Sequence, residues 1–155
     1  MSGRRSTIDY SRAMGLAIEA ASHSGLEVPV AAVLYSRDGE VVSVGTNNRE
    51  SANDPTGHAE IVALRAGALA LKDWRLEGCT LVVTLEPCIM CAGAILASRI
   101  ETLVFGAYDP SEGAGGSMYD VLRDRRLNHS VEVVSGVLEE KCSQLLIDFF
   151  GSKRS

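Results

Sequence analysis

Apolar residues recur along this chain with two spacings, one typical of helices and the other of buried strands. Amphipathic segments with apolar residues three or four positions apart predict helices, and short apolar runs bounded by turn residues predict strands. The predicted helices cover residues 10–24, 58–71, 88–98 and 138–150. The predicted strands cover residues 28–35, 41–44, 80–85, 101–107 and 131–134.

The order of these elements predicts the fold class. Strands that alternate with helices indicate an α/β domain whose sheet is largely covered. The chain has 155 residues, no internal repeat and no linker rich in proline and glycine. Residues 1–155 are therefore expected to form a single domain, with an ordered core over about residues 8–150.

Composition and charge narrow the class of protein further. Hydrophobic residues make up 46% of the chain, which is an ordinary globular composition. No stretch approaches the roughly 20 apolar residues that cross a bilayer, and no apolar signal region follows the polar N-terminus, so we expect a cytoplasmic protein without a membrane segment. The 15 basic and 20 acidic residues give a net charge of −5, which argues against wrapping by nucleic acid but allows a local basic patch.

Two short segments, each at the start of a predicted helix, carry candidate metal ligands. Cys88 and Cys91 follow Pro87 and are three positions apart, so both thiols can lie on one face of the first helical turn. Free N–H groups and the helix dipole favour thiolates at this position. His58 can supply a nitrogen from the start of the other helix. Three protein ligands leave the fourth tetrahedral position for water, as in catalytic zinc sites.

Glu60 supplies the acid–base group that such a site needs. It lies two residues after His58, close to the metal but free not to coordinate it. Water held by zinc loses a proton near neutral pH and becomes a nucleophile, and a carboxylate can carry that proton to a ring nitrogen and a departing amine. The pattern His-x-Glu followed by Pro-Cys-x-x-Cys is itself a known signature of zinc-dependent base deaminases, although either half alone is a weak signal.

The cysteines allow two other interpretations. In a closed structural zinc site Cys79 would be the fourth ligand, but such a site has no need of Glu60. A redox Cys-x-x-Cys pair would leave both His58 and Glu60 unexplained. We expect Cys79 and Cys142 to be small buried apolar residues rather than metal ligands.

Beyond the zinc motif, the chain resembles the cytidine-deaminase superfamily and, within it, the bacterial tRNA-specific adenosine deaminases. The resemblance spans about residues 10–150 and rests on the segments 28–33, 54–56, 84–94, 104–107, 127–129 and 148–150 together with Asn47. It implies a three-layer α/β/α sandwich with a five-stranded mixed sheet, one Zn²⁺ per subunit and a homodimer. It also implies hydrolytic conversion of adenosine to inosine at the wobble position of arginine tRNA, with the anticodon stem-loop as partner.

The resemblance also assigns substrate contacts by position. Asn47 matches a residue that hydrogen-bonds the target nucleoside, and Val30 matches an apolar wall of the base pocket. Arg49, Asp109 and Asn128 match contacts to the flanking RNA. Phe149 and Phe150 match an aromatic pair near the mouth of the site. Two other functions stay open, namely a free-base or nucleoside deaminase of the guanine or cytosine type and a non-enzymatic zinc-stabilised RNA-binding module.

Several of these residues have simpler interpretations that the sequence leaves open. Asn47 can bridge its own loop, and Val30 suits any buried strand. Phe149 and Phe150 can pack a helix end against the core. Glu86 is either a partner of the metal site or an ordinary strand-end carboxylate.

Three further features have more than one interpretation. Gly57 stands where the family usually has alanine, and we expect little effect from the missing methyl group. The basic residues near the C-terminus form either a strip that faces phosphate or a solvated surface. They are Arg123, Arg125, Arg126, Lys153 and Arg154. The alanine-rich segment 92–97 suits either a dimer contact or the core.

Overall fold

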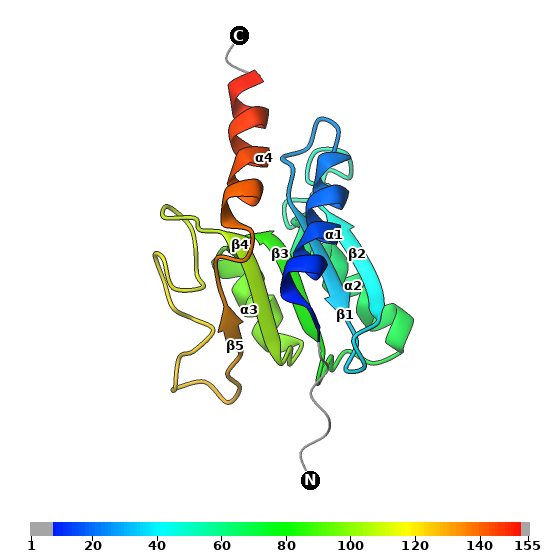
Figure 1. Cartoon of the computed structure of the whole chain (residues 1–155). Coiled ribbons are helices and arrows are strands. Elements are labelled where there is room, and N and C mark those ends of the chain that lie inside the picture. The colour runs from blue at the N-terminus through cyan, green and yellow to red at the C-terminus, as the bar shows by residue number, and fades with distance from the viewer. Residues whose placement is uncertain (1–7, 153–155) are drawn as a thin grey trace.

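The computed structural model describes residues 8–152, which form one five-stranded sheet between two layers of helices (Figure 1). The helices are α1 (Tyr10–Ser22), α2 (Ala59–Leu71), α3 (Ile89–Ala97) and α4 (Glu139–Ser152). The strands are β1 (Ala31–Tyr35), β2 (Val41–Thr46), β3 (Thr80–Leu85), β4 (Thr102–Ala107) and β5 (Glu132–Val134). The predicted three-layer α/β/α class with a five-stranded mixed sheet is confirmed.

The sheet combines antiparallel and parallel pairs in the order β2-β1-β3-β4-β5. β1 pairs antiparallel with β2 and β3, whereas β3, β4 and β5 run parallel. α3 connects the parallel strands β3 and β4. The carboxyl ends of these strands therefore lie at one edge of the sheet, where ligands bind in open α/β folds.

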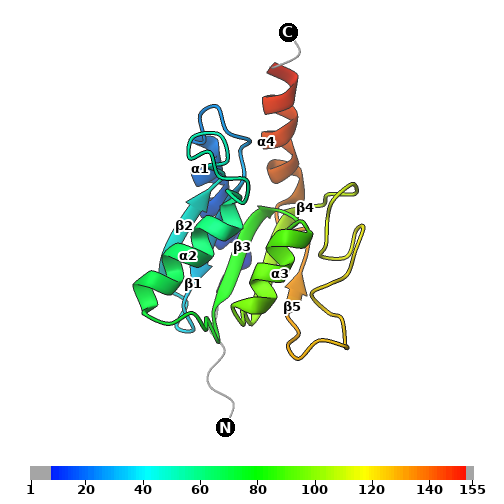
Figure 2. The same cartoon turned by 180° about the vertical axis from the view of Figure 1, so that it is seen from behind.

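Each face of the sheet has its own apolar core, because successive strand residues point to opposite faces. Ala32, Leu34 and Val83 pack with apolar residues of α2 and α3. Val33 and Val82 pack with apolar residues of α1 and with Cys142 of α4. Figures 1 and 2 show α1 and α4 on one face and α2 and α3 on the other.

Two strand ends differ from the sequence prediction for identifiable reasons. β1 begins at Ala31 rather than at residue 28, because Pro29 has no N–H and the Val30 N–H donates to the Val28 carbonyl at 2.8 Å. β2 continues to Thr46, because Thr46 pairs with Ala31 in the antiparallel register. The remaining ends differ from prediction by at most two residues.

Membrane insertion has no support in the described helices. Between residues 8 and 152, none of them combines the length and the apolar character needed to cross a bilayer. The cytoplasmic location stays a prediction.

Candidate metal centre and active-site cleft

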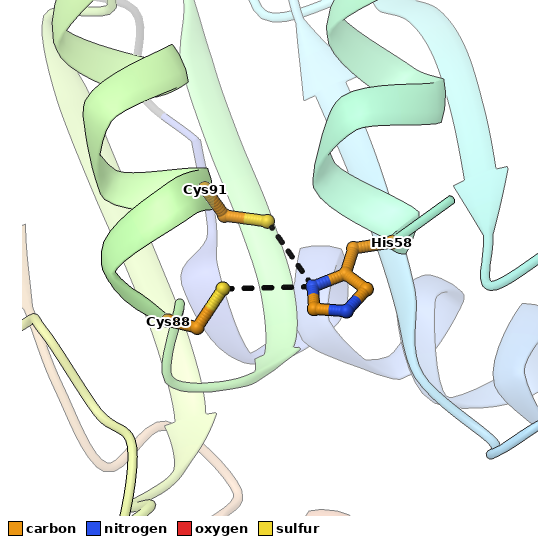
Figure 3. A group of neighbouring side chains, drawn as sticks. All are labelled: His58, Cys88 and Cys91. Atoms are coloured by element: carbon orange, nitrogen blue, oxygen red, sulfur yellow. Dashed lines mark hydrogen bonds between the residues drawn. The ribbon is translucent and has the colours of Figure 1, made fainter. Parts of the chain in front are cut away.

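Two helix starts bring His58, Cys88 and Cys91 together (Figure 3). His58 is the N-cap residue of α2 and Cys88 the N-cap residue of α3, both with extended backbone. Neither side chain forms the usual capping hydrogen bond, so both are free to face a ligand. Cys91 lies in the first turn of α3 and is fully buried.

The distances within this group fit a zinc ion. The three ligand atoms lie within 4.8 Å of one another, and Nδ1 of His58 is 3.5 Å from each cysteine sulfur. A tetrahedral zinc with Zn–S of about 2.3 Å and Zn–N of about 2.0 Å places its nitrogen and sulfur ligands about 3.5 Å apart. One imidazole nitrogen and two thiolates are also a donor set that zinc prefers.

The group has no fourth ligand among residues 8–152, as a catalytic site requires. Cys79 precedes β3 whereas Cys88 follows it, so a closed structural site with Cys79 is excluded. Cys79 and Cys142 are buried, as predicted. Burial raises the pKa of both thiols, that of Cys142 to about 11.

The two cysteines of the group differ in acidity. Hydrogen bonds donated to the Cys88 sulfur by the Cys91 thiol and, to a smaller extent, by the His58 imidazole lower the pKa of Cys88 to about 4. The hydrogen bond from Cys91 to Cys88 and, as a smaller contribution, burial raise the pKa of Cys91. Zinc held by both sulfurs as thiolates would displace the proton that the raised pKa keeps on Cys91.

Glu60 lies beside the group without belonging to it. It is in the first turn of α2, lines the cleft and is 4% exposed. Burial raises the pKa of its carboxyl group to about 7, so this group can accept and release a proton near neutral pH. An uncoordinated acid beside an open metal position is the arrangement predicted from the sequence.

A cleft of about 490 Å³ opens over these residues, which is within the range of small-ligand sites. Most residues proposed from the sequence line this cleft. They are Val30, Asn47, Arg49, Asp109 and Phe150, together with His58, Glu60 and Cys88.

Asn47 connects the cleft to the start of α2. Its side-chain oxygen accepts the N–H of Ala59 at 2.8 Å, and its backbone N–H donates to Val30 at 3.3 Å. The side chain therefore bonds a helix N-terminus rather than its own loop, and it lines the cleft as well.

Asn128 and Phe149 are placed differently. Asn128 lies in a separate hollow with Arg123 and Arg125 and does not line the cleft. Phe149 is also outside the lining, but its ring meets that of Phe150 edge to face at 5.2 Å. The two remain predictions as RNA contacts.

The predicted basic strip is partly neutralised by neighbouring aspartates. Arg123 pairs with Asp120 at 3.1 Å, and Arg126 pairs with Asp124 at 2.6 Å. Both pairs lie at the surface, although the Asp124 side chain is partly buried, and surface pairs contribute little to stability. Lys153 and Arg154 lie outside the described residues.

Sequence reasoning missed several cleft residues because they come from distant segments. These are Glu27, Val28, Glu50, Leu85, Tyr108, Ser111, Glu112 and Leu146. The Glu27 carboxylate accepts the N–H groups of Glu50 and Ser51 at 3.1 and 2.8 Å, which ties two loops together. No local spacing signals such a contact.

Gly57 lies close to the segment of Asn48 and Arg49, which leaves no room for a side chain. The difference between glycine and alanine at this position therefore matters more than the sequence suggested. The Asn48 N–H donates to the Gly57 carbonyl at 2.9 Å. A Cβ atom on Gly57 would lie 2.3 Å from the Asn48 side-chain oxygen and 2.9 Å from the backbone nitrogen of Arg49. The side chain can move, but the Arg49 backbone has to shift.

Gly57→Ala is expected to destabilise the protein by about 1–3 kcal/mol, the usual cost of overpacking, because the Arg49 backbone must shift. Bound zinc should be retained. Gly15→Ala in α1 is the matched control, because a Cβ there meets no atom within 4 Å. Thermal unfolding and zinc content measure both variants, and a Gly57→Ala protein as stable as Gly15→Ala would contradict this packing.

Comparison with known proteins agrees with the fold and the site. Residues 7–107 match the model of the cytidine and deoxycytidylate deaminase zinc-binding region. A tRNA-specific adenosine deaminase of Bacillus subtilis is 49% identical over 128 residues, which are 83% of this chain and 79% of that protein.

Solved structures show the same fold. One from a study of A-to-I editing by tRNA:A34 deaminases at the tRNA wobble position has a TM-score of 0.82 and 41% identity, covering 86% of this chain and 97% of that chain. A guanine deaminase from Nitrosomonas europaea has a TM-score of 0.80 over 97% of this chain and 89% of that chain, but at 24% identity it bears on the fold alone.

An open zinc-type ligand set beside an uncoordinated acid defines the class as metal-dependent hydrolytic enzymes. The chain belongs to the zinc-binding cytidine and deoxycytidylate deaminase family and, within it, to the tRNA-specific adenosine deaminases.

Proposed function

We propose that this protein hydrolyses adenosine at the wobble position of a tRNA anticodon, in arginine tRNA, to inosine and ammonia. Water supplies the oxygen, the carbon–nitrogen bond to the exocyclic amino group breaks, and the amino group leaves as ammonia. The observation that supports this proposal is the convergence of three metal ligands beside a cleft that His58, Cys88 and Glu60 line. The 49% identity to a tRNA-specific adenosine deaminase supports this substrate.

In this proposal His58, Cys88 and Cys91 hold Zn²⁺. When bound, zinc lowers the pKa of water and makes hydroxide available near neutral pH. The Glu60 carboxylate accepts a proton from the attacking water and delivers protons to the ring nitrogen and the departing amino group. Its burial keeps bulk water from competing for these protons.

The cleft walls suit an unstacked base. A loop base leaves its stack at lower cost than a duplex base, which favours an anticodon loop as substrate. Val30 offers an apolar surface and Asn47 an amide, while Phe150 can stack a neighbouring base at the mouth. Arg49 is the cleft residue suited to contact phosphate.

Asn47→Asp is expected to separate the two roles of this residue. Aspartate keeps an acceptor for the Ala59 N–H but lacks the amide donor, so the fold should stay intact while deamination falls about tenfold or more. Asn47→Ala removes both groups and should also lower stability by about 1 kcal/mol. Thermal unfolding and kcat/KM measure the two effects, and full activity in Asn47→Asp would leave Asn47 a purely structural role.

The test of the proposed function is a side-by-side assay of substrates. Zinc-loaded protein is incubated with an anticodon stem-loop carrying a wobble adenosine and, separately, with free guanine, cytosine and adenosine. Inosine is expected in the stem-loop, with little turnover of the free compounds. Efficient turnover of a free base with indifference to RNA would favour the alternative deaminase and refute the proposal.

We also propose that residues 8–152 fold as one domain.

We further propose that two copies of the protein form a homodimer through α3. This helix lies on the outside of the molecule (Figure 2), and its Ile89 side chain is 56% exposed. Gly93 and Ala97 are exposed four and eight positions later, on the same side of the helix. Small side chains there allow a second copy to approach closely.

Gly93→Lys is expected to convert this dimer to a monomer. A Cβ on Gly93 meets no atom within 4 Å, so the subunit itself tolerates the side chain. Gly15→Lys makes the same change on an equally open position of α1 and should leave the dimer intact. Light scattering coupled to size-exclusion chromatography gives the mass. A monomeric wild-type protein, or a Gly93→Lys dimer of wild-type strength, would contradict this interface.

A further inference from the structure

Glu86 is a second buried carboxylate in the cleft, and the proposed deamination gives it no task. It follows β3 directly, precedes Pro87 and Cys88, and is 2% exposed. It lines the cleft but is not part of the metal-ligand group. Within residues 8–152, no lysine or arginine forms an ion pair with it. A buried carboxylate needs compensating hydrogen bonds, so its partners indicate its role.

Among the described residues, the donors to the Glu86 carboxylate all belong to one loop, residues 109–117. Oε1 accepts the backbone N–H of Asp109 at 2.9 Å and the hydroxyl of Ser117. Oε2 accepts the N–H groups of Gly115 and Ser117, each at 3.0 Å. Hydrogen bonds to an ionised carboxylate are stronger than those between neutral groups. The carboxylate therefore holds the loop at both ends.

The loop closes around this carboxylate without spare room. A Cβ atom on Gly113 would lie 2.4 Å from Cδ of Glu86. Gly113 also forms a β-bridge with Cys88, and the Ala114 N–H donates to the Pro87 carbonyl at 2.8 Å. The loop is thus joined to the segment that carries the candidate metal ligand Cys88, through Glu86 and through the backbone.

We propose that Glu86 is a positioning residue that fixes the 109–117 loop, and with it the cleft wall formed by Asp109, Ser111 and Glu112, against the metal-binding segment. This inference rests on the proposed function, with Asp109 of that wall as the residue expected to contact the RNA that flanks the target adenosine. A loop held in one geometry before the substrate arrives loses less conformational entropy on binding. Its release therefore weakens substrate binding more than it slows the chemical step, which depends on Glu60.

Hydrogen exchange in Glu86→Gln tests the anchoring. The amide presents an NH₂ group to N–H donors that need an acceptor, so at least one loop hydrogen bond is lost. Exchange in peptides covering 109–117 of the zinc-loaded protein should become about tenfold faster. Glu101→Gln, which changes an exposed residue directly before β4, should leave it unchanged. Wild-type exchange in a folded Glu86→Gln protein overturns the anchoring role.

Steady-state kinetics on the stem-loop test the positioning role. Glu86→Gln should raise KM about tenfold with kcat within about twofold, at unchanged zinc content. Ser117→Ala removes only the hydroxyl donor to Glu86 and should change loop exchange and KM in the same directions by smaller factors. If Glu86→Gln does not fold, the Ser117→Ala variant alone tests the positioning role.

The outcomes separate this inference from the proposed function. Faster loop exchange with an unchanged KM, or a fall in kcat alone, overturns the positioning role. If the wild-type protein forms no inosine, the proposed function fails together with the positioning role, whereas hydrogen exchange still decides whether Glu86 anchors the loop.

Discussion

Replacing Glu60 with glutamine is expected to remove deamination while leaving the fold and the bound zinc intact. The amide has nearly the shape of the carboxyl group but cannot carry a proton from water to the leaving amino group. General acid–base catalysis typically contributes about 10²- to 10⁴-fold, and turnover should fall by at least that range. Burial already raises the pKa of Glu60 and disfavours its charged form, so a neutral side chain costs the fold little.

Single-turnover inosine formation, zinc content and thermal unfolding measure this prediction together. Glu77→Gln makes the same chemical change on an exposed residue and should match the wild-type protein in all three measurements. A folded, zinc-loaded Glu60→Gln protein that retains wild-type activity would contradict the proton-transfer role. RNA binding without any inosine formation, in both the wild type and this variant, would instead indicate the non-enzymatic RNA-binding module.

Replacing Cys91 with alanine should remove zinc and activity together. Cys91 offers one of three ligand atoms, and two remaining ligands do not make the tetrahedral three-ligand site of a catalytic zinc. Changes to residues that merely support a ligand lower metal affinity by about 10- to 100-fold, so loss of a ligand should cost more than 100-fold. Zinc per chain after dialysis against a chelator measures this loss.

Cys142→Ala is the matched control for the loss of zinc. Cys142 is as deeply buried as Cys91, with 1% against 0% exposure, but it packs on the α1 and α4 side of the sheet. Its replacement should lower stability by creating a small cavity and leave the zinc content at one per chain. Equal zinc loss in both variants would mean that global destabilisation, rather than ligand removal, empties the site.

The metal-binding group could be predicted from sequence because its geometry is local. Cys91 lies three positions after Cys88, and this spacing fixes the relative direction of the two side chains once a helix begins there. Likewise, Glu60 lies two residues after His58, which places His58 at the N-cap of α2 and Glu60 in its first turn. Only the meeting of the two helix starts depends on the fold, which brings α2 and α3 into contact on one face of the sheet.

The remaining parts of the site depend on packing between segments that are distant in sequence. The bond from Ala59 to Asn47 and the loop held by Glu86 both depend on which segments the sheet order brings together. The close approach at Gly57 arises in the same way, and a comparison of residue types alone suggested no consequence for it. Asn128 lies in a hollow separate from the cleft, and its contact with the flanking RNA stays a prediction.

X-ray absorption at the zinc K-edge of the purified protein is the most direct test of the convergence at the two helix starts. The expected spectrum contains one nitrogen ligand at about 2.0 Å, two sulfur ligands at about 2.3 Å and one oxygen from water. A site with four protein ligands, or with a third sulfur, would contradict an open catalytic zinc held by His58, Cys88 and Cys91.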